Sequence, residues 1–227
     1  DKRWTLADIG CGQGLLTFHL APMVKHIFAV DVSETAIKEL EKRLDDLYYT
    51  RREDAEKIEA FVADAENLGD LRADVMLLSF FGANRKILDS VFERAGRRAI
   101  IIMRGRDAVG IDMIRDSHSE FSSVETEAYL EEKGYRYKKN TMEMQLGKPF
   151  RTIGEIHRFL GEYGQSLYRD DADCISLGEG CESIDGIEAK VAGAEERIIK
   201  TNRFDFPYYL PKSINVAIYI VVKTQGR

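Results

Sequence analysis

Residues 7–14, with the sequence Ala-Asp-Ile-Gly-Cys-Gly-Gln-Gly, constrain the fold of this chain more than any other stretch. An apolar run, Trp4 to Ile9, leads into this cluster of three glycines, and a helical pattern follows at once. Glycine accepts backbone angles closed to other residues, and its missing Cβ lets a ligand approach the main chain. A strand that turns through such a loop into a helix is typical of the nucleotide-binding corner of an open α/β sheet.

The spacing of the glycines separates this loop from two other nucleotide-binding loops. Gly10, Gly12 and Gly14 occupy the first, third and fifth positions, and Asp8 lies two residues before the first of them. A dinucleotide-binding loop would need its third glycine where Leu15 stands, which disfavours an NAD(P)-dependent oxidoreductase. A P-loop would need a Lys-Ser or Lys-Thr pair, and none follows.

Strand and helix patterns alternate through the first half of the chain. Apolar runs predict strands at Trp4–Ile9, His26–Val30, Ile58–Ala63, Ala73–Ser79 and Ala99–Met103. Helical patterns lie between them, at Gly14–Lys25, after the N-cap residue Ser33 (Ile37, Leu40, Leu44, Leu47), and around Ile87, Leu88 and Val91. This alternation predicts an α/β fold with a doubly wound, mainly parallel sheet, whose ligand-facing strand ends share one edge.

The rest of the chain is less regular. We expect a helical stretch at 105–134 in which Ser123 caps Val124–Lys133, a strand at Tyr135–Leu146, helices at Phe150–Tyr163 and Ile187–Thr201, and a last strand at Ile214–Val222. We therefore predict a single domain over residues 1–227. Its cofactor-binding half is 1–104, and its substrate-side half, 105–227, carries an insertion at about 165–205. Because the first strand starts almost at Asp1, we also expect that an N-terminal segment is missing.

Composition restricts the class of partner. The net charge is −6, whereas proteins that bind polyanions usually carry a basic excess, so nucleic acid is a disfavoured partner. The longest apolar run, Ile214 to Val222, is far shorter than the ~20 residues of a membrane span, and no signal sequence opens the chain. Cys11, Cys174 and Cys181 form no CxxC pair, which predicts a cytoplasmic protein without a metal site.

Polar residues also end the next three predicted strands. Asp31 follows the second strand, Asp64 the third, and Ser79 ends the fourth. A carboxylate at Asp31 can accept hydrogen bonds from both hydroxyls of a ribose, while the alternative role for either acid is to cap the following helix. Because the carboxyl ends of parallel strands meet at one edge, we expect all three beside the glycine loop.

The glycine loop, with its pattern Asp-x-Gly-x-Gly-x-Gly, and these three strand ends closely resemble the class I S-adenosylmethionine-dependent methyltransferases. The resemblance is motif-specific over residues 4–103 and general from there to 224. It implies a seven-stranded sheet with an antiparallel last strand and a bound S-adenosylmethionine. It places the loop on the amino-acid end of the cofactor, the acids on ribose and adenine, and the fourth strand end beside the methionine moiety. The cofactor-binding residues that it implies are Asp8, Gly10, Cys11, Gly12, Gly14, Asp31, Val32, Asp64, Ala65 and Ser79.

The methyl acceptor is less well specified. Ser79-Phe80-Phe81-Gly82 stands where nucleic-acid and protein-amide methyltransferases often carry Asn or Asp, two prolines and an aromatic residue, so we expect a small-molecule acceptor. Candidate catalytic residues are His118 as a base, Arg104 as a ligand for an anionic group, and Tyr208 in an aromatic segment that is otherwise core. A methyltransferase-like scaffold or regulatory protein without turnover stays an alternative, and the oligomeric state is open.

Overall fold

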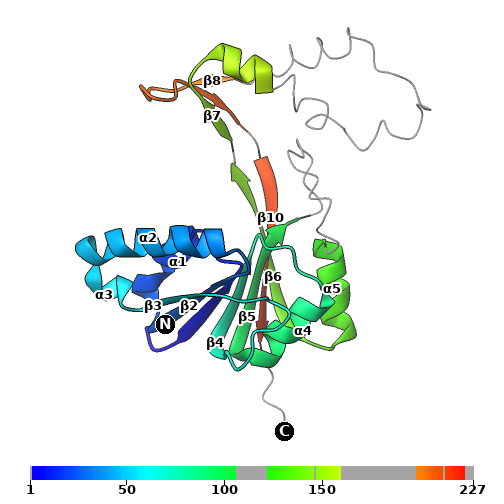
Figure 1. Cartoon of the computed structure of the whole chain (residues 1–227). Coiled ribbons are helices and arrows are strands. Elements are labelled where there is room, and N and C mark those ends of the chain that lie inside the picture. Colours follow the sequence, from blue (N-terminus) through cyan, green and yellow to red (C-terminus); the bar gives the residue numbers. More distant parts are fainter. Residues whose placement is uncertain (1, 106–121, 146, 160–197, 212, 223–227) are drawn as a thin grey trace, which may run out of the picture. The chain divides into compact units, whose positions relative to one another are not determined.

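The structure is a computed structural model that describes residues 2–105, 122–145, 147–159, 198–211 and 213–222. The chain divides into two compact units (Figure 1). Unit 1 comprises residues 1–104, 118–141 and 217–227, and unit 2 comprises residues 105–117 and 142–216. Unit 2 thus begins earlier than the predicted insertion at about 165–205, and the single-domain organisation stays a prediction.

A seven-stranded sheet forms the framework of unit 1, with residues 142–145 of β6 and 213–216 of β10 assigned to unit 2. Its strands are β1 (Thr5–Ile9), β2 (His26–Asp31), β3 (Ile58–Val62), β4 (Ala73–Ser79), β5 (Ala95–Arg104), β6 (Arg136–Gln145) and β10 (Ser213–Val222). Their order is β3-β2-β1-β4-β5-β10-β6. The first five strands pair in parallel, and β10 is antiparallel. The predicted fold class is therefore confirmed, including the antiparallel last strand.

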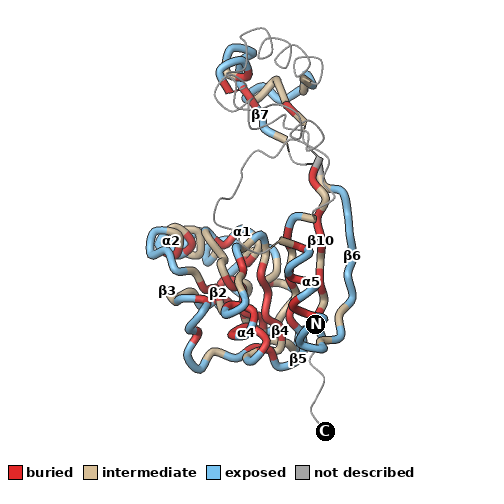
Figure 2. The backbone as a smooth tube through the Cα atoms, turned by 90° about the vertical axis from the view of Figure 1, so that its right-hand side faces the viewer, coloured by how far each residue is buried: buried red, intermediate tan, exposed pale blue. Residues whose placement is uncertain are grey.

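Helices cover both faces of this sheet (Figure 1). They are α1 (Leu15–Leu20), the 3-10 turn η1 (Ala21–Met23), α2 (Glu34–Thr50), α3 (Arg52–Ala55), α4 (Arg85–Arg94) and α5 (Ser123–Glu132). Alternate strand residues supply two cores, which run along the strands in Figure 2. One core includes Leu40 of α2 and Leu77 of β4, and the other includes Leu88 of α4, Tyr129 of α5 and Leu78 of β4.

Local sequence explains where several helices begin and end. Ser33 caps α2 as predicted, because its Oγ accepts a hydrogen bond of 3.3 Å from the Ala36 amide. The predicted helix at Gly14–Lys25 is shorter, since regular α-helix ends at Leu20 and a 3-10 turn with Pro22 as its second residue follows.

The predicted cap of α5 was wrong by one residue. Ser122, rather than Ser123, is the N-cap, and its hydroxyl accepts a hydrogen bond from the Glu125 amide. The Glu125 carboxylate in turn accepts from the Ser122 amide, which completes a capping box. The glutamate three residues after Ser122 selects this serine, and Ser123 is buried within the helix.

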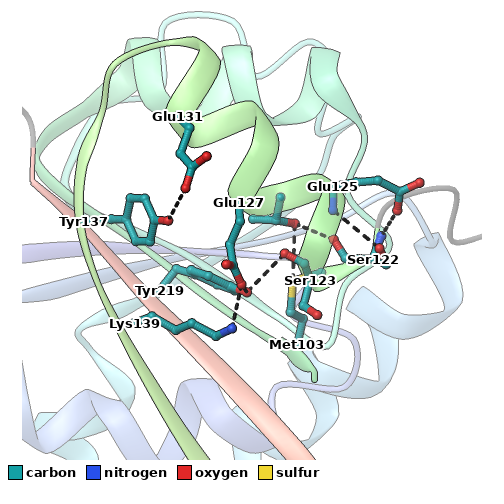
Figure 3. Close-up of polar contacts among 10 residues, drawn as sticks. Met103, Ser122, Ser123, Glu125, Glu127, Glu131, Tyr137, Lys139 and Tyr219 are labelled. Atoms are coloured by element: carbon teal, nitrogen blue, oxygen red, sulfur yellow. Dashed lines mark hydrogen bonds and ion pairs between the residues drawn. The ribbon is translucent and has the colours of Figure 1, made fainter. Parts of the chain in front are cut away.

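Polar contacts join α5 to the strands beneath it (Figure 3). The Tyr219 hydroxyl of β10 lies 2.7 Å from Glu127 Oε1, and Lys139 of β6 donates to the same oxygen at 2.6 Å. Thr126 donates to the Met103 sulfur of β5 at 3.3 Å. These bonds connect the helix to three neighbouring strands.

Unit 2 contains a small antiparallel sheet. Its order is β7-β9-β8, formed by β7 (Lys148–Phe150), β9 (Tyr208–Leu210) and β8 (Ile199–Lys200). The helix predicted from Phe150 was therefore wrong at its start: Phe150 pairs with Tyr208, and helix is found at 153–159. The predicted helix Ile187–Thr201 was wrong at Ile199 and Lys200, while its residues 187–197 lie outside the described part.

The described residues contain neither a membrane-spanning helix nor a metal-binding cluster. None of the described helices combines the length and the apolar character needed to cross a lipid bilayer. The described part of the chain also holds no group of three or more His, Cys, Asp or Glu side chains arranged to bind a metal ion.

Candidate functional site

The three glycines between β1 and α1 have different surroundings. A Cβ on Gly10 would lie 2.1 Å from Cδ2 of Phe81, and one on Gly14 would lie 2.8 Å from Cγ of Leu40. These two glycines are therefore required for packing. Gly12 also has a positive φ, of 54°, but its absent Cβ points into open space with no heavy atom within 4 Å. The backbone at Gly12 can be approached by a ligand.

Asp31, at the end of β2, connects the glycine loop to the following helix. Its Oδ2 accepts a hydrogen bond of 2.8 Å from the Gly12 amide. Its Oδ1 accepts one of 2.9 Å from the Ser33 amide, at the N-cap of α2. Each carboxylate oxygen has a second lone pair, so the group keeps the capacity to accept hydroxyl donors.

Asp8 lies beneath the loop and is only 2% exposed. The Thr17 hydroxyl of α1 donates to its Oδ2 at 2.6 Å. Burial raises the pKa of the Asp8 carboxyl, while the Thr17 hydrogen bond opposes this rise and the charge of Asp31 adds to it. Burial likewise raises the pKa of the Cys11 thiol to about 12, so this cysteine is a protonated packing residue near neutral pH.

A pocket of about 300 Å³ opens beside the loop. Its lining residues come from the ends of β1, β2 and β3 and from the segment after β4: Ile9, Gly10, Val30, Asp31, Val32, Ala63, Asp64, Ala65, Glu66, Phe81 and Ile87. Five of the predicted cofactor-binding residues are in this lining, namely Gly10, Asp31, Val32, Asp64 and Ala65. The other five, Asp8, Cys11, Gly12, Gly14 and Ser79, lie at the same edge of the sheet without lining the pocket.

The pocket has a distinctive charge. Asp31, Asp64 and Glu66 contribute three carboxyl groups, and none of the eleven described residues that line it is Lys, Arg or His. Its walls are otherwise aliphatic or aromatic. The apolar walls suit a flat ring, and the carboxyl groups suit hydroxyl donors, amino donors or a positive charge on the same ligand. The carboxyl groups would repel phosphates.

Comparisons with known proteins agree with this geometry. Residues 6–98 match the family model described as a methyltransferase domain. Over residues 6–98 the chain thus matches the methyltransferase-domain family, and its sheet has the class I methyltransferase fold.

Solved structures share the fold of this chain at low sequence identity. A putative methyltransferase from Bacillus halodurans has a TM-score of 0.60 at 13% identity, over 99% of this chain and 94% of that chain. The YcgJ protein of Bacillus subtilis has a TM-score of 0.57 at 16% identity, with the same two coverages. The [4+2]-cyclase SpnF has a TM-score of 0.56 at 14% identity, over 100% of this chain and 77% of that chain. No curated protein sequence matches the chain.

The family match and the fold support S-adenosylmethionine as the cofactor and methyl transfer as the reaction. The pocket residues fit that cofactor: carboxylates can accept from its ribose and amino groups, and the open backbone at Gly12 leaves room beside them. Six lining residues were not predicted, namely Ile9, Val30, Ala63, Glu66, Phe81 and Ile87. Their common signal is position, since each lies within four residues of a strand end or in the first turn of α4.

Phe80, next to this pocket, is the only non-glycine residue with a positive φ in the described part of the chain. Its φ is 49°, its amide donates to the Ile102 carbonyl of β5 at 2.8 Å, and its side chain is 50% exposed. A left-handed conformation costs a non-glycine residue roughly 1–2 kcal/mol. The adjacent Phe81 instead packs on Gly10, so the strained turn gives the two rings different surroundings.

The three candidate catalytic residues belong to separate parts of the chain, and their roles stay predictions. Arg104 is exposed at the end of β5, and Tyr208 belongs to β9 of unit 2, where it pairs with Phe150 and Lys200. Neither lines the pocket. His118 lies outside the described residues, and its predicted role as a base stays a prediction.

Proposed function

We propose that the pocket beside the glycine loop binds the adenosyl part of S-adenosylmethionine and that the domain methylates a small-molecule acceptor. The observation that carries this proposal is the lining of the pocket, which is rich in carboxylates and free of cations among its described residues. S-adenosylmethionine bears a sulfonium, an ammonium, an adenine amino group and ribose hydroxyls, all of which suit such a lining. NAD and ATP would bring phosphates to it.

Individual residues take the following roles in this proposal. Asp31 accepts from the ribose hydroxyls, and the Gly12 backbone gives the cofactor its close approach to the loop. Asp8, held by Thr17, faces the ammonium from below, directly or through water. The segment Asp64–Ala65 lies along the adenine edge, with Val32 beside the ribose and Ser79 near the methionine moiety.

When bound, the cofactor supplies a methyl group activated by a positive sulfur. The protein then has to hold the acceptor in line with the methyl–sulfur bond and to exclude water. Such alignment contributes about 7–11 kcal/mol to lowering a barrier. A general base is required only where the acceptor must lose a proton.

Two features support a small-molecule acceptor. The net charge of −6 disfavours a polyanionic substrate. The segment Ser79–Gly82 also lacks the paired prolines typical of enzymes that methylate base or amide nitrogens. A putative RNA methyltransferase from Pyrococcus horikoshii shares the fold, with a TM-score of 0.52 at 15% identity, so acceptor assays should include RNA.

Isothermal titration calorimetry tests the cofactor assignment. We expect S-adenosylmethionine and S-adenosylhomocysteine to bind, while NAD and ATP do not. Binding of NAD without S-adenosylmethionine would refute the proposal. Binding of S-adenosylmethionine without methyl transfer to small molecules, protein or RNA would favour the scaffold alternative.

A further inference from the structure

Asn84 joins two walls of the pocket although it does not line the pocket itself. Its Nδ2 donates a hydrogen bond of 2.9 Å to Glu66 Oε1. Its Oδ1 accepts one of 2.9 Å from the Ile87 amide. Glu66 and Ile87 are both pocket-lining residues, so one amide side chain connects the segment after β3 with the first turn of α4.

The two walls come from strands that are not neighbours. In the sheet order, β2 and β1 separate β3 from β4. No backbone ladder can therefore hold the segment after β3 against the segment after β4. A side-chain bridge at this point has a direct effect on how far apart the walls stand.

The segment after β3 is itself ordered as far as Glu66. Asp64 Oδ1 accepts a hydrogen bond of 2.9 Å from the Glu66 amide, which closes a local turn. Lys86 Nζ also lies 3.6 Å from Glu66 Oε2, but its side chain is 80% exposed, and such ion pairs contribute little. The hydrogen bond from Asn84 is thus the better-defined link between Glu66 and α4.

Capping of α4 does not by itself explain an asparagine here. Ser, Asp and Asn are about equally good N-cap residues. Of these three, only Asn can accept from a helix amide with one atom and donate to a carboxylate with the other. The second bond, to the pocket residue Glu66, is what the asparagine adds.

We propose that Asn84 is a positioning residue that holds Glu66 next to α4 through its hydrogen bond and so fixes the walls around the adenine of a bound adenosyl ligand. This inference rests on the proposed function, because it takes adenine as the group between the walls. It makes the Asn84–Glu66 pair a determinant of affinity for adenine-bearing ligands.

Substitutions at Asn84 and Glu66 can separate the positioning role of Asn84 from its role as the N-cap of α4. Asn84→Asp keeps the cap acceptor but places a carboxylate against Glu66. Glu66→Gln with Asn84→Asp restores one hydrogen bond of reversed polarity, now donated by the glutamine. Glu66→Gln alone keeps the original bond, and Asn67→Asp, at an exposed neighbouring position, serves as the control for added negative charge.

The readouts are the dissociation constants of adenosine and S-adenosylhomocysteine, measured by calorimetry, and the unfolding temperature of each variant. We expect Asn84→Asp to weaken the binding of both ligands about tenfold. Replacing one hydrogen bond by a repulsion between two carboxylates corresponds to roughly 1.4 kcal/mol. Glu66→Gln alone sets the reference for loss of the Glu66 charge, and the double variant should bind both ligands within about threefold of that reference. Asn67→Asp should bind as the unsubstituted protein does. Unfolding temperatures should stay close together, because the cap is retained throughout.

Equal binding by Asn84→Asp and the unsubstituted protein would overturn the inference and leave the proposed function intact. Failure of the double variant to recover binding, with normal unfolding, would also overturn it. If neither ligand binds the unsubstituted protein, the proposed function fails, and the inference fails with it.

Discussion

Asp31 combines two tasks in one carboxylate, since it orders the Gly12 amide and the N-cap of α2 in the free protein. In the proposed function it also accepts from the ribose. We expect Asp31→Ala to weaken S-adenosylhomocysteine by about 2 kcal/mol, or roughly 30-fold, because charge-assisted hydrogen bonds are lost. Calorimetry measures this change, with Asp45→Ala on the exposed side of α2 as control. An unchanged dissociation constant would remove Asp31 from the site.

Gly10 and Gly12 should respond differently to the same substitution. Gly10→Ala forces its new Cβ into the Phe81 ring, so we expect a loss of about 2–4 kcal/mol of unfolding free energy from overpacking and positive φ. Gly12→Ala meets no protein atom, so it should cost only about 1 kcal/mol of stability.

At Gly12 we expect ligand affinity, rather than stability, to be the more sensitive property. Its Cβ would occupy space that the ligand needs, so Gly12→Ala should weaken S-adenosylhomocysteine more than its effect on folding suggests. Urea unfolding and calorimetry on both variants provide the comparison. Normal ligand affinity of Gly12→Ala would show that the loop does not contact the ligand.

The limits of sequence reasoning at this scale are visible in the pocket. Asp31 and Asp64 could be predicted because an acid that ends an apolar strand is a recognisable pattern. Phe81 could not, because its place depends on the missing Cβ of Gly10, 71 positions earlier in the chain. Glu66 could not be predicted as a pocket residue for a similar reason, since its partner Asn84 is 18 positions away.

At the scale of elements, α5 depends on a charged contact with β6 and β10. Hydrogen bonds from Lys139 and then from Tyr219 lower the pKa of the Glu127 carboxyl below its ordinary value. A lowered pKa in the folded state means that the contribution to stability is present above the ordinary pKa of 4.5 and is lost as pH falls through the folded pKa.

We therefore expect Glu127→Gln to reduce the unfolding free energy at pH 7 by about 1–2 kcal/mol, through loss of charge-assisted bonds. At pH 3, below the ordinary pKa of 4.5, the variant and the unsubstituted protein should be closer in stability, because the contribution of the carboxylate is lost on acidification. Urea unfolding at the two pH values provides the test. A difference that grows on acidification would contradict the assigned direction of the pKa shift.

The elements that could be predicted are those with a long, regular pattern. Every strand of the large sheet except β6 contains an apolar run, and α2 has both a cap and a repeating apolar face. The small sheet of unit 2 escaped because its strands have only two or three residues, too few to show alternation. Its segments pair through long-range contacts, such as Phe150 with Tyr208, that local propensity does not record.

At the scale of the whole molecule, the position of β10 between β5 and β6 is decisive for stability. Three of its residues, Val216, Ala217 and Tyr219, are almost completely buried. We expect a chain truncated after residue 212 to lose cooperative unfolding, because two strand edges and a core face become exposed. Circular dichroism during heating measures this, and a sharp transition near that of the full chain would refute it.

The same strand order determines when each strand can find its partner during translation. As the chain leaves the ribosome, β1 to β5 emerge before β6 and can pair with one another, but β6 finds no partner when it appears. Its only neighbour in the sheet, β10, is made after the whole of unit 2 up to residue 212. During that interval the nascent protein presents an open edge on β5, and a slow stretch of translation there would prolong its exposure to chaperones and to aggregation.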